Sequence, residues 1–77
     1  MTKVSLDKSD AEDLITYKLR NIQREISTIL DRWSEASVES FLEKSQAGKI
    51  EESENDAIDL KQLVHEQKKL QLLLEKL

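Results

Sequence analysis

Apolar residues in the first half of the chain recur at alternating intervals of four and three, which is the heptad spacing of a helix that packs along one seam. Leu14 and Leu30 widen this stripe, as expected for a helix with more than one neighbour. Ser9 and Glu12 have the spacing of a capping box, so we predict a helix over about residues 10–33. The predicted seam consists of Ile15, Leu19, Ile22, Ile26, Ile29 and Trp33.

A short segment without the stripe follows, and it contains the one glycine of the chain. Ser37 is a suitable N-cap for a short helix over about residues 38–46. Gly48 suits the left-handed position just past a helix end, and Ile50 can supply the apolar contact that accompanies such a cap. A bent continuation of the first helix is the alternative that the sequence leaves open.

Ser53 and the acidic residues after it favour a second long helix, over about residues 54–76, because negative charge is favourable at a helix N-terminus. Its seam again has spacings of three and four, and comprises Leu60, Leu63, Gln67, Leu70 and Leu74. Gln67 is the polar member. It either specifies register or partner from within the seam, or lies at the seam edge and contacts water.

Two matched seams joined by a reversal predict an all-α fold, an antiparallel helical hairpin with a short connecting helix, as a single domain over residues 1–77. Trp33 and Phe41 are expected to pack at the turn end. With no proline, no cysteine and three aromatic residues, the chain has little material for a core of its own. We therefore expect association through these seams, either as a homodimer forming a four-helix bundle or with a protein partner.

The formal net charge is −4, and the acidic excess lies in residues 34–56. This argues against phosphate backbones as the main partner of that segment. The first helix nevertheless carries basic side chains, so a small nucleic-acid-binding regulatory dimer using Arg20 and Arg24 is the alternative function. Tyr17 lies off the seam, and with these two arginines it is a candidate for outward contacts.

No pattern in the chain predicts an enzyme, a cofactor site or a metal site. The acidic cluster of residues 51–59 lacks the spacing of a calcium-binding loop, and it is better explained as a solvated turn and helix start. His65 has no motif around it that would use a general base. Without a signal peptide or a long apolar run, we expect a cytoplasmic protein that does not cross a membrane.

The middle of the chain resembles small helical-hairpin proteins of archaea and bacteria, many of them of the antitoxin-like type. The similar features are Ser37 to Lys44, the turn Ala47 to Ile50, and an acidic start to a leucine-rich helix. The resemblance implies a hairpin that binds a small toxin-like protein and has no catalytic residues. Residues 19–32 are also similar to the first helix of all-helical chorismate mutases, but residues 57–77 lack the arginine that such an enzyme needs.

Overall fold

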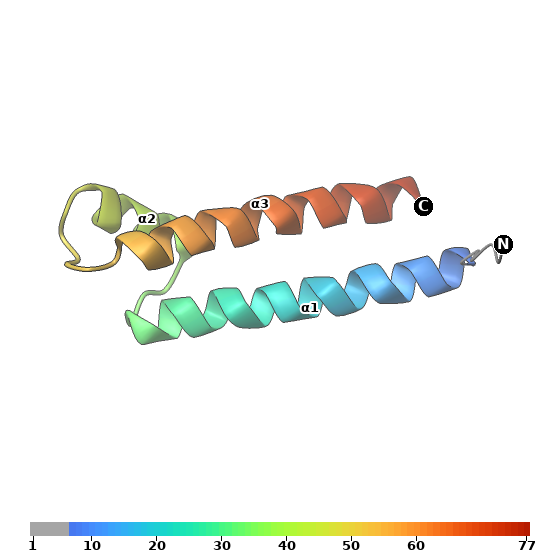
Figure 1. Ribbon diagram of the computed structural model, residues 1–77, viewed down its shortest axis with the longest axis horizontal. Helices are drawn as coiled ribbons and strands as arrows, with labels where there is room; N and C mark the ends of the chain where they lie inside the picture. Colours follow the sequence, from blue (N-terminus) through green and yellow to red (C-terminus); the bar gives the residue numbers. More distant parts are fainter. Residues whose placement is uncertain (1–6) are drawn as a thin grey trace, which may run out of the picture.

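A computed structural model describes residues 7–77 and has three helices in this range, α1 (Lys8–Arg32), α2 (Val38–Gln46) and α3 (Glu54–Lys76). The two long helices lie side by side and run in opposite directions, while α2 lies at the end where the chain reverses (Figure 1). The predicted all-α hairpin with a short connecting helix is therefore confirmed. We call the reversal end the closed end, and the other, where α1 begins and α3 finishes, the open end.

The start of α1 differs from the prediction. The N-cap is Asp7, whose backbone is extended, and the predicted cap Ser9 lies inside the first turn. The amide of Ala11 donates to the carbonyl of Asp7 at 2.9 Å, which begins the helical hydrogen-bonding pattern two residues earlier than expected. Aspartate and serine are both favoured at N-caps, so the sequence offered two starts, and no side-chain cap forms at the one used.

Two helix ends are closed by the same backbone motif. After α1, the amide of Ser34 donates to the carbonyl of Asp31 and that of Glu35 to Leu30. After α2, Gly48 donates to the carbonyl of Ser45 and the next amide to that of Lys44. These pairs form Schellman motifs, which require a left-handed residue. Gly48 fills this position at φ 71° as predicted, whereas Ser34 adopts φ 54° with a side chain that disfavours it.

The connecting helix is fixed at both ends. The Ser37 hydroxyl accepts a hydrogen bond from the Ser40 amide at 3.1 Å, so the predicted N-cap is confirmed. Ser53 occupies the N-cap position of α3, but its side chain makes no capping bond to that helix. Its side chain is fully buried, and its hydroxyl donates to the Ile50 carbonyl at 2.8 Å while lying 2.7 Å from the hydroxyl of Ser45. Since Ser53 has one hydroxyl proton, Ser45 is the donor in the second bond.

The core is concentrated toward the closed end. Phe41 and Leu60 are fully buried at its centre, and the rings of Trp33 and Phe41 lie 6.0 Å apart between centroids. The prediction that both aromatics pack at the turn end is thus confirmed. The buried cluster comprises Ile22, Ile26, Ile29, Phe41, Ala57 and Leu60.

Candidate interaction surface

Most of the predicted seam faces the interior of the hairpin. The two long helices therefore cover much of the apolar surface that we expected a partner to cover. The buried seam members are Ile15, Ile22, Ile26, Ile29 and Leu60. The half-buried members are Leu19, Trp33, Leu63, Gln67, Leu70 and Leu74. All but Ile15 of the buried set belong to the cluster toward the closed end, and most of the half-buried ones lie along α3 beyond it.

Gln67 makes a contact between the long helices. Its side-chain amide donates to the amide oxygen of Gln23 at 3.0 Å, with Gln67 half-buried and Gln23 exposed. The bond therefore lies at the edge of the seam, where water also reaches it. It fixes which turn of α3 lies beside which turn of α1, because shifting one helix along the other by one turn would move the two amides about 5 Å apart.

Large apolar side chains remain exposed, mainly toward the open end. Leu14 is 54% exposed and Leu73 48% exposed. Tyr17 and Leu72 are more exposed still, whereas Ile58, also exposed, lies in the first turns of α3 near the closed end. Exposed single leucines are ordinary, but here several lie toward the same end of two neighbouring helices, which makes that end a candidate surface.

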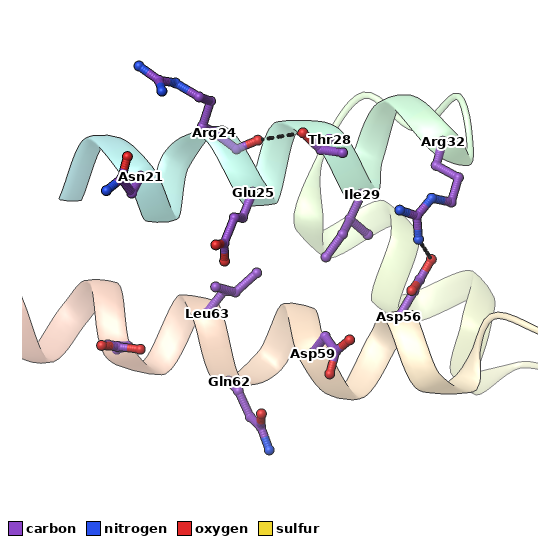
Figure 2. Close-up of a pocket in the computed structure, with 11 residues that line it drawn as sticks. Asn21, Arg24, Glu25, Thr28, Ile29, Arg32, Asp56, Asp59, Gln62 and Leu63 are labelled. Carbon is purple, nitrogen blue, oxygen red and sulfur yellow. Dashed lines mark hydrogen bonds and ion pairs between the residues drawn. The ribbon is translucent and has the colours of Figure 1, made fainter. Parts of the chain in front are cut away.

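A groove runs between α1 and α3 on one side of the hairpin (Figure 2). The side chains of Glu25 and Leu63 point into the space between the helices, and that of Arg24 extends away from α3. Four carboxylates and two guanidinium groups line this groove, which makes it acidic on balance. Its lining consists of Asn21, Arg24, Glu25, Thr28, Ile29, Arg32, Asp56, Asp59, Gln62, Leu63 and Glu66.

A second groove, nearer the open end, is basic. Lys18 of α1 and three basic side chains of α3, Lys61, His65 and Lys69, line it together with Gln62, Glu66 and Leu70. The predicted outward residues Tyr17, Arg20 and Arg24 are all exposed. The basic groove contains neither arginine, and Arg24 instead borders the acidic one.

Asp56 joins the two long helices at the closed end. One of its oxygens, Oδ2, accepts a hydrogen bond from the indole Nε1 of Trp33 at 2.7 Å and one from the Arg32 guanidinium at 2.8 Å. The indole bond, followed by the Arg32 bond and charge, lowers the pKa of Asp56, while partial burial opposes the shift. The carboxylate thus satisfies the indole N–H and ties the end of α1 to the first turn of α3.

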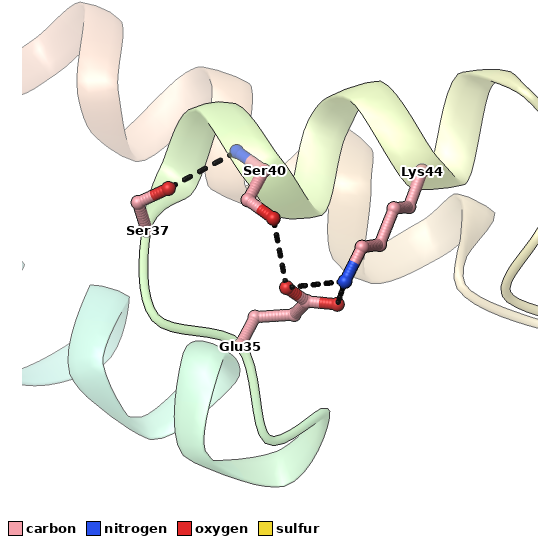
Figure 3. A network of polar contacts seen from close by, with 4 residues as sticks. All are labelled: Glu35, Ser37, Ser40 and Lys44. Carbon is pink, nitrogen blue, oxygen red and sulfur yellow. Dashed lines mark hydrogen bonds and ion pairs between the residues drawn. The ribbon is translucent and has the colours of Figure 1, made fainter.

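Glu35 holds the connecting segment against α2 (Figure 3). Its carboxylate accepts hydrogen bonds from the ammonium group of Lys44 at 3.0 Å and from the Ser40 hydroxyl at 3.1 Å. The Lys44 bond is the main reason that the pKa of Glu35 is lowered. The sequence did not predict these contacts of Glu35, nor those of Asp56, because the partners come close only once the chain has folded back.

Within residues 7–77, no three His, Cys, Asp or Glu side chains gather as a metal ion would require. His65 is exposed beside lysines, and the acidic residues of the turn before α3 and of the start of α3 are exposed apart from Asp56. In the same part of the chain, no helix combines the length and apolarity that crossing a bilayer demands. The apolar surface of the open end, to which both long helices contribute exposed large side chains, is the candidate functional surface.

Comparison with known proteins gives no further information on the apolar surface of the open end. The resemblance to antitoxin-like hairpins accordingly stays a prediction from the short motifs of the middle segment. Compared with protein-family models, with curated proteins and with solved structures, the chain finds no match.

Proposed function

We propose that this chain is a protein–protein interaction module that associates with itself, bringing the helices of two hairpins together in a four-helix arrangement. One observation carries the proposal: beyond Leu60, α3 has no buried side chain, although it is rich in leucine. The apolar residues that remain half-buried or exposed there are Leu63, Val64, Leu70, Leu72, Leu73, Leu74 and Leu77.

The energetics favour covering this surface. Full burial of one leucine stabilises a protein by about 1.5–3 kcal/mol, so each half-exposed leucine leaves on the order of 1 kcal/mol unused. Within residues 7–77 seven apolar side chains are buried, which is a small core for a domain that must reach a stability of about 5 kcal/mol or more. A second hairpin laid on the open end would supply the missing contacts.

The test is the mass of the purified chain in solution as a function of concentration. Sedimentation equilibrium from micromolar to millimolar protein is expected to show a shift from 8.9 kDa toward twice that mass. Leu73→Lys should oppose the shift, because it places a charge in the proposed interface. A folded chain that keeps the monomer mass at every concentration would contradict self-association.

A partner protein other than a second copy is the extension that the antitoxin-like resemblance suggests. It would use the same leucines, since a toxin-like protein that covers a helical hairpin also needs an apolar surface. Nucleic-acid binding has weaker support. Arg24 borders a groove with four carboxylates, and the chain carries a net charge of −4.

A further inference from the structure

The acidic groove and the basic groove share Gln62 and Glu66, and beyond them the same side of the hairpin ends in an apolar surface at the open end. On α3, residues 59, 63 and 66 line the acidic groove, and the same spacing of three and four continues to Leu70, Leu73 and Leu77. On α1, Leu14 lies one and two heptads from the groove residues 21 and 28. We call Leu14, Leu70, Leu73 and Leu77 the open-end patch.

The register of the long helices brings the two parts of this patch together. The Gln23–Gln67 bond and the Trp33–Asp56 bond fix how far α1 and α3 are displaced along each other. Counting outward from these bonds at equal rise per residue places Leu14 level with the last turn of α3. The open-end patch therefore extends across both helices.

We propose that a second copy of this chain docks on the open-end patch, antiparallel and about a twofold axis near Leu14, so that only the open ends of the two hairpins overlap. This inference rests on the proposed self-association and specifies its geometry. A twofold interface brings one patch against the same patch of the other copy, so leucine meets leucine.

The acidic half of the same face argues against the other arrangements. A parallel pair would bring the carboxylates of Glu25, Asp59 and Glu66 against the same groups of the second copy. An antiparallel pair overlapping along its whole length would lay the leucines of one copy over the carboxylates of the other. Both arrangements bury more carboxylates than the two guanidinium groups of the groove can pair, which is costly. Overlap of the open ends alone avoids this cost.

Charges on either side of Leu14 also fit a second copy. Asp10 and Lys18 lie four residues before and after it, on the same side of α1. In an antiparallel pair centred on Leu14, Asp10 of each copy lies opposite Lys18 of the other. Within residues 7–77 the ion pairs are Arg32–Asp56 and Lys44–Glu35, so neither Asp10 nor Lys18 is engaged in one inside the hairpin.

The first experiment exchanges these two charges and measures the dimer dissociation constant by sedimentation. Asp10→Lys alone and Lys18→Asp alone should each weaken the dimer about tenfold, because two exposed ion pairs become repulsive contacts. The double variant D10K/K18D should return to within about threefold of the original, since the pairs are restored with reversed sign. Single variants that leave the constant unchanged, or a double variant that adds their losses, would overturn the antiparallel arrangement.

A matched pair of apolar variants separates the patch from general exposure. Leu73→Lys should weaken the dimer at least thirtyfold, because a leucine is lost from both sides of the interface. Ile58→Lys replaces a similarly exposed apolar residue near the closed end and should leave the dissociation constant within about threefold of the original. Helicity measured by circular dichroism checks that each variant remains folded. If Ile58→Lys dissociates the dimer and Leu73→Lys does not, the interface lies elsewhere.

A distance measurement tests the geometry independently. The chain has no cysteine, so Ser27→Cys introduces a single labelling position on an exposed turn of α1. It lies thirteen residues beyond Leu14, so spin labels on two copies should be about 40 Å apart in the proposed dimer. A parallel dimer would bring them within about 20 Å. A dimer with the short distance would overturn this inference and leave the proposed function standing, whereas a monomer would overturn both.

Discussion

The link between Asp56 and Trp33 offers the sharpest test of what holds the hairpin closed. In Asp56→Ala both hydrogen bonds to the carboxylate are lost, and the indole N–H of Trp33 loses its partner. A hydrogen bond to a charged group contributes about 1.5–3 kcal/mol. The Arg32 pair adds less than about 1 kcal/mol, since the Arg32 side chain is 56% exposed. We expect the free energy of unfolding to fall by about 2 kcal/mol.

Urea denaturation followed by circular dichroism measures this change, at one fixed protein concentration because association would add stability of its own. Arg32→Ala is the matched control, for it removes the exposed ion pair and keeps the indole bond. Its cost should stay below about 1 kcal/mol. If the two variants cost the same, the indole bond is not the main contributor and the reasoning fails.

The same residue gives the stability a pH dependence of known sign. Because the pKa of Asp56 is lowered in the folded state, its contribution is present above its ordinary value near 3.8 and is lost as the pH falls through the folded value. Unfolding curves measured from neutral to acid pH should therefore lose less stability in Asp56→Ala than in the original chain. An equal loss in both would exclude Asp56 as a source of the acid sensitivity.

Four further substitutions test the rest of the closed end by the same denaturation assay. Ser34→Gly should stabilise the hairpin by about 0.5–1 kcal/mol, because it removes a non-glycine residue from a left-handed conformation. Gly48→Ala should cost a similar amount for the same reason, although no atom lies near enough to clash with the added methyl group. A loss of stability in Ser34→Gly would contradict this view. Phe41→Ala should cost about 3–5 kcal/mol, enough to unfold much of the chain, because the ring is fully buried; a cost below about 1 kcal/mol would mean that the centre of the core lies elsewhere. Ser53→Ala should cost about 1–2 kcal/mol, since it leaves the Ser45 hydroxyl and the Ile50 carbonyl without their partner, and a neutral result would show that water replaces it.

The arrangement of helices could be predicted from local patterns because each signal is contained in a few neighbouring residues. The spacing of Ile22, Ile26 and Ile29 predicts one buried face, and Gly48 predicts the end of the connecting helix. The left-handed serine after α1 could not be foreseen, since nothing in its composition distinguishes it from an ordinary loop residue. Tertiary contacts select that turn.

The candidate surface was harder to predict, because a periodic stripe does not say which neighbour covers it. The seam from Ile15 to Ile29 was assigned to association, yet it is mostly occupied by α3 of the same chain. Leu14 and Leu73, which lie at the margins of the stripes, are exposed instead. Their position depends on the rotation and register of two helices, which are set by contacts such as Gln23–Gln67 between residues 44 positions apart.

The uneven distribution of the core has a consequence for how the molecule melts. Backbone amides near Phe41 and Leu60 should exchange their hydrogens only when the whole hairpin opens, while those in the last turns of α3 exchange by local fraying. A ligand or second chain bound at these frayed ends would first slow the hydrogen exchange of their amides. It would also raise the melting temperature as its concentration increases. Folding of those ends and recognition would then be one event.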